Sequence, residues 1–208
     1  MEELIREIEK YKIIAIVRGV NFLKMEPLFE ALYDGGIKHV EITLNTKDAC
    51  KSIDNMNNLY GSRMVIGAGT VLNAKMAKDA INAGARFLVS PNVDEGMITT
   101  AISHNVLPIP GAMTPTEIAQ AINYGASMIK LFPVSILGPK YIKELTGPFD
   151  NLKIIAVGGI SIDNAKEYME YGAVGLGIGG SLINNTIIED GDFKAITDYA
   201  KKLRNSIL

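Results

Sequence analysis

Lys130 lies inside the apolar run "MIKLFP" (128–133), which is otherwise typical of a buried β-strand. Lysine is almost never fully buried unless a partner pairs with it or a reaction uses it. Burial penalises the charged ammonium, so a desolvated lysine loses proton affinity, and its neutral amine can attack a carbonyl group. The sequence therefore favours a nucleophilic amine that bonds to a ketone. A structural ion pair between Lys130 and Glu41 is the alternative.

Glu41 lies in a second apolar run, "HVEIT" (39–43). A carboxylate held near an amine and apolar walls can be tuned towards the operating pH, and it can then move protons directly or through a water molecule. Simple pairing with Lys130 is again the alternative, and the two interpretations are compatible. We expect Glu41 to act as the proton carrier if both side chains reach one cavity.

The elements that must position these residues are short apolar runs, each followed by a segment of helical periodicity that often ends at a glycine. Such βα units indicate parallel strands. The succession predicts a single (β/α)₈ TIM barrel domain over residues 1–208, with an N-terminal helix over 1–11 and the barrel from about residue 12. An open doubly wound sheet is the alternative. Eight strand candidates recur: 13–18, 39–43, 64–70, 87–92, 107–112, 128–133, 153–160 and 174–180.

Strand alternation tests this prediction, because successive side chains point alternately into a barrel and out to its helices. In "MIKLFP" the alternation directs Lys130 and Phe132 inward, and in "HVEIT" it directs Glu41 inward. Arg18 follows at the end of "IIAIVR". The charged residues within the strands thus belong to the interior set, towards the end where barrel active sites are built.

Two successive strand ends are rich in glycine: "IAVGGIS" (155–161) and "GLGIGGSL" (175–182). In barrels, the loops after strands 7 and 8 often bind phosphate through exposed backbone N–H groups. We therefore expect Gly158, Gly159 and Gly180 to let the backbone approach an anion, with the hydroxyl of Ser181 beside it. Plain turns are the alternative.

Four further residues are expected near the same site. Arg18 could clamp a substrate carboxylate or phosphate with its forked donors, although a salt bridge at the rim is equally compatible with its position. Thr70 offers a hydroxyl to a carboxylate or carbonyl, or caps the following helix. Pro91 would shape an apolar wall, and Phe132 would serve both the core and the ligand.

Composition excludes several functional classes. The chain has 208 residues, is 48% hydrophobic and carries a formal net charge of −2, which does not favour nucleic acid or an anionic membrane as a partner. One cysteine, Cys50, permits neither an internal disulfide nor a cysteine-based metal cluster, and two histidines make a histidine-based metal site improbable. The start "MEELIREIEK" lacks the apolar core of a signal peptide, and no apolar run is long enough to span a membrane. We expect a cytoplasmic protein.

With these residues placed, the sequence resembles the 2-keto-3-deoxy-6-phosphogluconate (KDPG) aldolase family from about residue 11 to the end of the eighth strand. The resemblance implies a homotrimeric (β/α)₈ enzyme that forms a Schiff base and needs no metal or other cofactor. The matching motifs are "VEITLNT", "IGAGTVLN", "LVSPN", "PIPGAMTPTE", "IKLFP", "GPKYIKEL", "GPFDNLKIIAVGGIS" and "GIGGSL".

The resemblance also implies residue roles. It assigns Lys130 as the Schiff-base lysine and Glu41 as the general acid/base, and it places Thr70 and Pro91 in the pyruvoyl pocket. The phosphate would lie among the residues of the two glycine-rich strand ends: Gly158, Gly159, Gly180 and Ser181. The implied reaction is reversible cleavage of a phosphorylated keto acid to pyruvate and glyceraldehyde 3-phosphate. A phosphosugar isomerase or epimerase on a similar barrel, and a non-catalytic phospho-ligand-binding protein, are the competing hypotheses.

Two positions depart from the pattern of many gluconate-type members. Asn45 stands where they carry an arginine that holds the pyruvate carboxylate, and Val157 stands where they carry threonine. Both features are similar to the branch that acts on the galactonate epimer (KDPGal). We therefore expect Arg18 to take over part of the anion clamping. The sequence leaves the preferred substrate open among the gluconate and galactonate derivatives and unphosphorylated 4-hydroxy-2-ketoglutarate.

Overall fold

The computed structural model describes residues 1–149 and 151–207. The predicted domain end at residue 208, and residue 150 within the motif "GPFDNLKIIAVGGIS", lie outside the described residues. All strands belong to one parallel sheet with the order β5-β4-β3-β2-β1-β9-β8-β7-β6. The strands are β1 (Ile13–Val17), β2 (His39–Thr43), β3 (Val65–Gly69), β4 (Phe87–Val89), β5 (Leu107–Ile109), β6 (Gly111–Ala112), β7 (Ile129–Leu131), β8 (Ile154–Val157) and β9 (Gly175–Ile178).

The sheet closes on itself through the segment 107–112. Its first half, β5, pairs with β4, and its second half, β6, pairs with β7. Pro110 separates the two halves because proline has no N–H to donate to a ladder, while its carbonyl accepts the backbone N–H of Lys130 at 2.9 Å. The predicted barrel is therefore confirmed, and the fifth predicted strand is divided in two by its proline.

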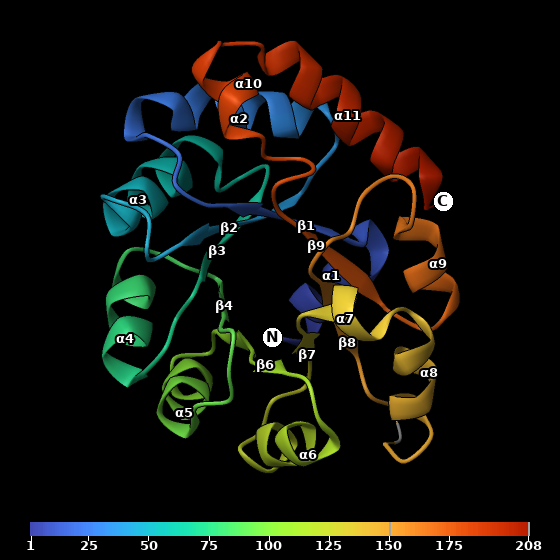
Figure 1. Ribbon diagram of the computed structural model, residues 1–208. Helices are drawn as coiled ribbons and strands as arrows, with labels where there is room; N and C mark the ends of the chain where they lie inside the picture. Colours follow the sequence, from blue (N-terminus) through green and yellow to red (C-terminus); the bar gives the residue numbers. More distant parts are fainter. Residues whose placement is uncertain (150, 208) are drawn as a thin grey trace.

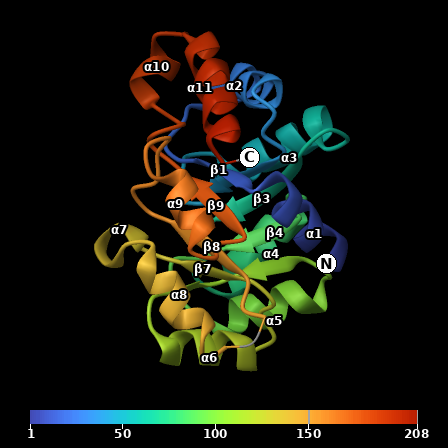
Figure 2. The same ribbon diagram turned by 90° about the vertical axis from the view of Figure 1, so that its right-hand side faces the viewer.

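Helices surround the barrel on its outside (Figure 1). In the side view, α1 lies at one end of the barrel, and α7 and α10 lie at the other (Figure 2). The helices are α1 (Glu2–Tyr11), α2 (Phe22–Asp34), α3 (Ala49–Tyr60), α4 (Ala74–Asn82), α5 (Glu95–Ser103), α6 (Pro115–Asn123), α7 (Val134–Leu137), α8 (Lys140–Thr146), α9 (Ala165–Glu170), α10 (Asn185–Glu189) and α11 (Phe193–Ser206). The predicted N-terminal helix is thus present.

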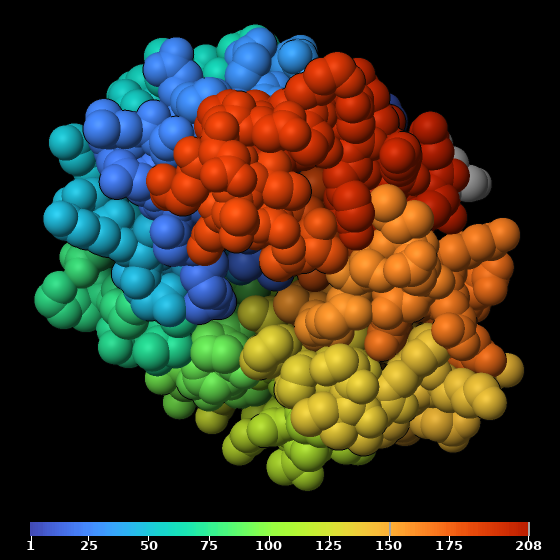
Figure 3. All heavy atoms as spheres, turned by 45° about the horizontal axis from the view of Figure 1, so that its top comes forward, coloured from blue at the N-terminus to red at the C-terminus, as the bar shows by residue number. Residues whose placement is uncertain are grey.

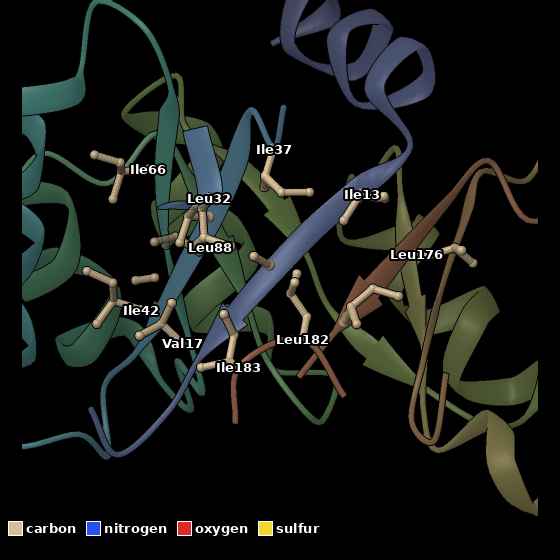
Figure 4. Close-up of a cluster of buried hydrophobic side chains, with 14 of the residues drawn as sticks. Ile13, Val17, Leu32, Ile37, Ile42, Ile66, Leu88, Leu176, Leu182 and Ile183 are labelled. Atoms are coloured by element: carbon tan, nitrogen blue, oxygen red, sulfur yellow. The ribbon is translucent and has the colours of Figure 1, made fainter. Parts of the chain in front are cut away.

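Strand alternation builds two apolar layers. Outward-facing side chains such as Ile13, Val17 and Leu176 pack beneath the helices in the larger cluster (Figure 4). Inward-facing side chains such as Ile14 and Ile16 form a second cluster inside the barrel. The bottom of this inner cluster is closed by the apolar residues of α1: Leu4, Ile5 and Ile8. The strands are therefore buried on both faces, as expected for a parallel sheet covered by helices.

Helix ends follow the local sequence. Thr114 and Glu117 form a capping box at the start of α6, which satisfies backbone N–H groups that a helix leaves free. Gly36 (φ +81°) and Gly125 (φ +99°) supply the left-handed turns that release the chain into β2 and β7. These signals fix where each helix stops, and hence where each strand can start.

The C-terminal helices complete the outer ring. In Figure 3, α10 and α11 (red) lie against the N-terminal part of the chain (blue), and α11 contacts α2. The N-terminal and C-terminal strands meet in the same way, since β1 pairs with β9. Within the described part of the chain, no helix has the length and apolar character required to cross a membrane.

Candidate active site

A cavity of about 440 Å³ opens at the carboxyl ends of the strands. Of the ten predicted site residues, nine line it: Arg18, Thr70, Pro91, Lys130, Phe132, Gly158, Gly159, Gly180 and Ser181. Glu41, the tenth, is not part of the wall, so the condition that the Lys130 and Glu41 side chains both reach one cavity is not met. The fold thus gathers residues from six strand ends into one place, which is where barrels build their sites.

Lys130 is the middle residue of β7, and its side chain reaches the cavity wall. Its neighbours in register are Gly111 and Ile155, and only 5% of its surface is exposed. The Nζ atom lies 4.7 Å from the centroid of the Phe132 ring. Burial lowers the pKa of Lys130, the positive charge of Arg18 lowers it further, and Glu41 acts in the opposite direction.

Glu41 is the middle residue of β2 and is 2% exposed. Its register partners are Ile16 on β1 and Gly67 on β3. The carboxylate lies against Gly69, at a place where a side chain on that residue would collide with it. Burial raises the pKa of Glu41, while the charges of Lys130 and Arg18 oppose that rise.

Lys130 and Glu41 influence each other electrostatically without direct contact. Among the ion pairs of residues 1–149 and 151–207, none includes either side chain. The alternative of a structural Lys130–Glu41 ion pair is therefore not what the structure contains. Burial shifts both pKa values towards the neutral forms. An amine whose pKa is lowered is suited to attack a carbonyl, and a carboxyl group whose pKa is raised is suited to relay protons.

Arg18 is held at the rim by side-chain hydrogen bonds. Its Nη1 donates to Oδ1 of Asn45 at 3.1 Å, and its Nη2 donates to Oγ1 of Thr70 at 3.3 Å. Arg18 takes part in no ion pair within the described ranges, so the alternative of a rim salt bridge is absent there. The guanidinium therefore remains available to an anion in the cavity.

The two glycine-rich strand ends form a further part of the wall, next to the end of β1. Gly158 and Gly159 have φ values of +115° and +69°, which let the backbone turn its N–H groups in a way that other residues rarely allow. A Cβ atom built on Gly180 would meet nothing within 4 Å, so the backbone there faces open space. Oγ of Ser181 donates to the carbonyl of Ile160 at 2.7 Å, and its lone pairs remain free to accept.

Several lining residues were not singled out from the sequence. Ile16, Val157, Gly177 and Gly179 lie on the wall. The alternation rule could have found them, because each belongs to the inward-facing set of its strand. Asn45 was noted for its identity, but its hydrogen bond to Arg18 depends on a turn geometry that no sequence pattern reveals.

The histidines lie away from this cavity. His39 is at the start of β2, at the opposite end of the barrel, and His104 caps the C-terminus of α5. In the part of the chain that the structure describes, no three His, Cys, Asp or Glu side chains are grouped as metal ligands would be.

The model of the family described as KDPG and KHG aldolase matches residues 4–199. The chain belongs to this family. It is 37% identical over 171 residues to the probable 2-dehydro-3-deoxy-6-phosphogalactonate aldolase of Rhizobium meliloti, an alignment that covers 82% of this chain and 81% of that protein. It is 33% identical over 204 residues to the 2-dehydro-3-deoxy-phosphogluconate aldolase of Treponema pallidum, with 97% and 96% covered.

Solved structures of family members share the architecture. KDPG aldolase from Legionella pneumophila, crystallised with pyruvate captured at low pH as a covalent carbinolamine intermediate, superposes with a TM-score of 0.85 at 28% identity. The superposition covers 93% of this chain and 94% of that one. The barrel fold of this chain is therefore the fold of the aldolase family to which it belongs.

Proposed function

We propose that this protein is a class I aldolase that reversibly cleaves a 2-keto-3-deoxy-6-phospho sugar acid to pyruvate and D-glyceraldehyde 3-phosphate. The proposal rests on one observation: Lys130 is buried, has a lowered pKa and lies on the wall of a cavity of about 440 Å³. Family membership and the covalent pyruvate intermediate in the Legionella pneumophila relative support it.

In the proposed reaction, the neutral amine of Lys130 attacks the C2 ketone and forms a carbinolamine. Loss of water gives an iminium cation, which withdraws electrons from the C3–C4 bond. That bond breaks as the C4 hydroxyl loses its proton, and glyceraldehyde 3-phosphate departs as the aldehyde. The remaining enamine takes a proton at C3, and addition of water releases pyruvate and the free amine.

Glu41 is the proposed proton carrier for these steps. Because Glu41 does not line the cavity, it would accept the C4 hydroxyl proton and later return a proton to C3 through a water molecule. Its raised pKa suits this role, because burial makes the carboxylate a stronger proton acceptor than an exposed one. General acid–base help of this kind typically contributes about 10²- to 10⁴-fold to the rate.

Two groups of lining residues would hold the two anionic ends of the substrate. Arg18 and Thr70, already joined by a hydrogen bond, would bind the carboxylate beside the reacting ketone. Gly158, Gly159 and the residues around Ser181 would bind the phosphate through backbone N–H groups. Pro91 and Phe132 would pack against the carbon chain, and binding energy from the phosphate would fix C4 in a reactive pose.

Reductive trapping tests the proposal. Borohydride added with pyruvate should leave a stable adduct on Lys130, located by peptide mass spectrometry. Lys130→Met should abolish the adduct, whereas Lys78→Met, which changes an exposed lysine of α4, should not. An unmodified Lys130 in the wild-type protein would refute the covalent route. Lys130→Arg separates the competing hypotheses, since an isomerase that needs only a charge would keep its activity.

We further propose that the galactonate epimer (KDPGal) is the preferred substrate. Asn45 and Val157 are the basis, together with the similarity to the probable phosphogalactonate aldolase of Rhizobium meliloti. Pyruvate release from the two C4 epimers, measured side by side, tests this. A higher kcat/KM on the gluconate epimer would overturn the substrate assignment and leave the lysine chemistry intact.

The last parts of the proposal concern assembly and location. We propose a cytoplasmic homotrimer, as the family resemblance implies. Light scattering on the purified protein should give about three times the 22.5 kDa chain mass, and a monomer mass at working concentration would exclude the trimer. Fractionation of the source cells, followed by immunodetection, tests the location.

A further inference from the structure

A second cavity, of about 650 Å³, lies at the end of the barrel that α1 covers. In the side view this end is opposite to α7 and α10, and hence opposite to the candidate active site (Figure 2). The wall is formed by α1, by the starts of β2, β3 and β5, and by residues just before β2, β3, β4 and β5. Its volume is within the range of small-ligand pockets, which runs from about 300 to 1,000 Å³.

Three cationic side chains line this cavity: Lys38, Arg63 and Arg86. They come from the beginnings of three neighbouring strands, since β2 pairs with β3 and β3 pairs with β4. Nζ of Lys38 and Cζ of Arg63 lie 4.1 and 4.8 Å from the centroid of one ring, that of Tyr33. Two like charges near one aromatic ring repel each other, and an anion bound close to both would offset that repulsion.

The cationic side chains on this wall outnumber its carboxylates. None of the three takes part in an ion pair across residues 1–149 and 151–207. Glu3 and Glu7 on α1 also line the cavity, and they too are absent from those ion pairs. The chain as a whole carries a net charge of −2, so the excess of cationic over anionic side chains on this wall is a local feature.

The inner wall contains a buried imidazole that has no hydrogen-bond partner. His39 is 0% exposed, and neither Nδ1 nor Nε2 is hydrogen-bonded. Buried polar groups are nearly always hydrogen-bonded, so an exception calls for an explanation, and a bound ion is one. The ring of Tyr11 covers the imidazole at 5.9 Å between centroids, and both residues line the cavity.

We infer that this cavity is a second ligand site, which binds a small multivalent oxyanion bearing phosphate or carboxylate groups. Lys38, Arg63 and Arg86 hold the anion by charge-assisted hydrogen bonds. His39 donates an N–H to it once the Tyr11 ring turns aside. The inference does not depend on the proposed aldolase activity, because none of these residues lines the cavity that contains Lys130.

Side-chain NMR tests the site, because the chain has only two histidines. Pyrophosphate and citrate are the probes, and they separate a phosphate from a carboxylate ligand. Either anion should shift the imidazole resonances of His39 in a saturable way and raise its pKa by about one unit. His104, on a different element, should not shift and is the internal reference. Anions bound only in the other cavity would leave both histidines unchanged.

Matched variants complete the design. Arg63→Gln and Arg86→Gln should each weaken binding about tenfold or more, since each removes a charged hydrogen-bond partner. Lys78→Gln, an exposed change on α4, should have no effect, and Glu7→Gln should tighten binding by removing a competing carboxylate. The inference is overturned if neither anion shifts the imidazole resonances of His39, or if the Arg63→Gln and Arg86→Gln variants bind the anion as tightly as the wild-type protein. Pyruvate trapping by the same variants should be unchanged, so failure of the site and failure of the aldolase proposal are distinguishable.

Discussion

Gly69→Ala changes the position of Glu41 without changing its chemistry. Gly69 lies at the end of β3, beside the Glu41 carboxylate, and its backbone is not in the left-handed region, so alanine can adopt it. The added Cβ would stand 2.9 Å from Cδ of Glu41 and 3.0 Å from Cγ2 of Thr43. Glu41 must yield, because its carboxylate is the free end of a flexible side chain.

The size of the effect follows from this geometry. Carbon atoms in contact prefer a separation of about 3.5 to 4.0 Å, so the carboxyl group must retreat by roughly 1 Å. A misplacement of about 1 Å in a catalytic group can cost about 10²-fold in rate, which is about 3 kcal/mol of transition-state stabilisation. We therefore expect kcat to fall about 100-fold.

Two assays separate the proton carrier from the nucleophile. Pyruvate release from the cleaved substrate reports turnover, and borohydride trapping of pyruvate reports the amine of Lys130. Gly69→Ala should lose turnover and keep trapping. Gly147→Ala is the matched control, because it adds the same methyl group at an exposed helix end where the nearest atom is 3.6 Å away.

A small effect would refute the reasoning. If Gly69→Ala turned over within about threefold of the wild-type rate, with an unchanged Tm, the position of the Glu41 carboxylate would not matter. The proton would then have another carrier. A large loss of Tm together with lost trapping would instead show that the barrel had failed to fold, and Glu41→Gln would have to carry the test.

Three further outcomes are expected. The Glu41→Gln variant should still trap pyruvate, while its turnover falls about 10²- to 10⁴-fold. Glu41 raises the pKa of Lys130, so in this variant the acid limb of the pH profile of the trapping rate should move to lower pH. Arg18→Met should move that limb to higher pH, since Arg18 lowers the same pKa; an unmoved pH profile in both variants would contradict the electrostatic coupling. His39 has its pKa lowered from 6.5 to about 4, so the unfolded chain binds more protons between these values and stability falls as pH falls through them. His39→Leu should remove this loss of about 3 kcal/mol, measured by urea unfolding at pH 7 and pH 4.

The fold was predictable because each βα unit carries its own signals. Apolar strand runs, helical periodicity and glycines such as Gly36 and Gly125 act locally, and their order alone indicates parallel strands. The division of the fifth strand was not predicted, although Pro110 stood in the sequence. A proline excludes one hydrogen bond, but whether a strand continues past it depends on which neighbours pair on either side.

The candidate site was predictable where alternation fixed the direction of a side chain. Lys130 follows from its strand, and the carboxylate of Glu41 lies inside the barrel as the same rule requires. Its place off the cavity wall was not predictable, because depth within a barrel depends on the stagger between strands. The bond from Arg18 to Asn45 joins two loops whose relative position exists only after the barrel has closed.

Pro110 separates β5 and β6, the two ends of the strand order, and the proposed nucleophile Lys130 lies on the strand that pairs with β6. The backbone N–H of Lys130 donates to the carbonyl of Pro110. Glu41 lies on β2 and Arg18 follows β1, and both strands are distant from β7 in the strand order. A chain that extends only to β5 contains Glu41 but lacks Lys130, which is on β7. The cavity wall also includes the turns that follow β8 and β9, so it is complete only when all the strands of the sheet have assembled.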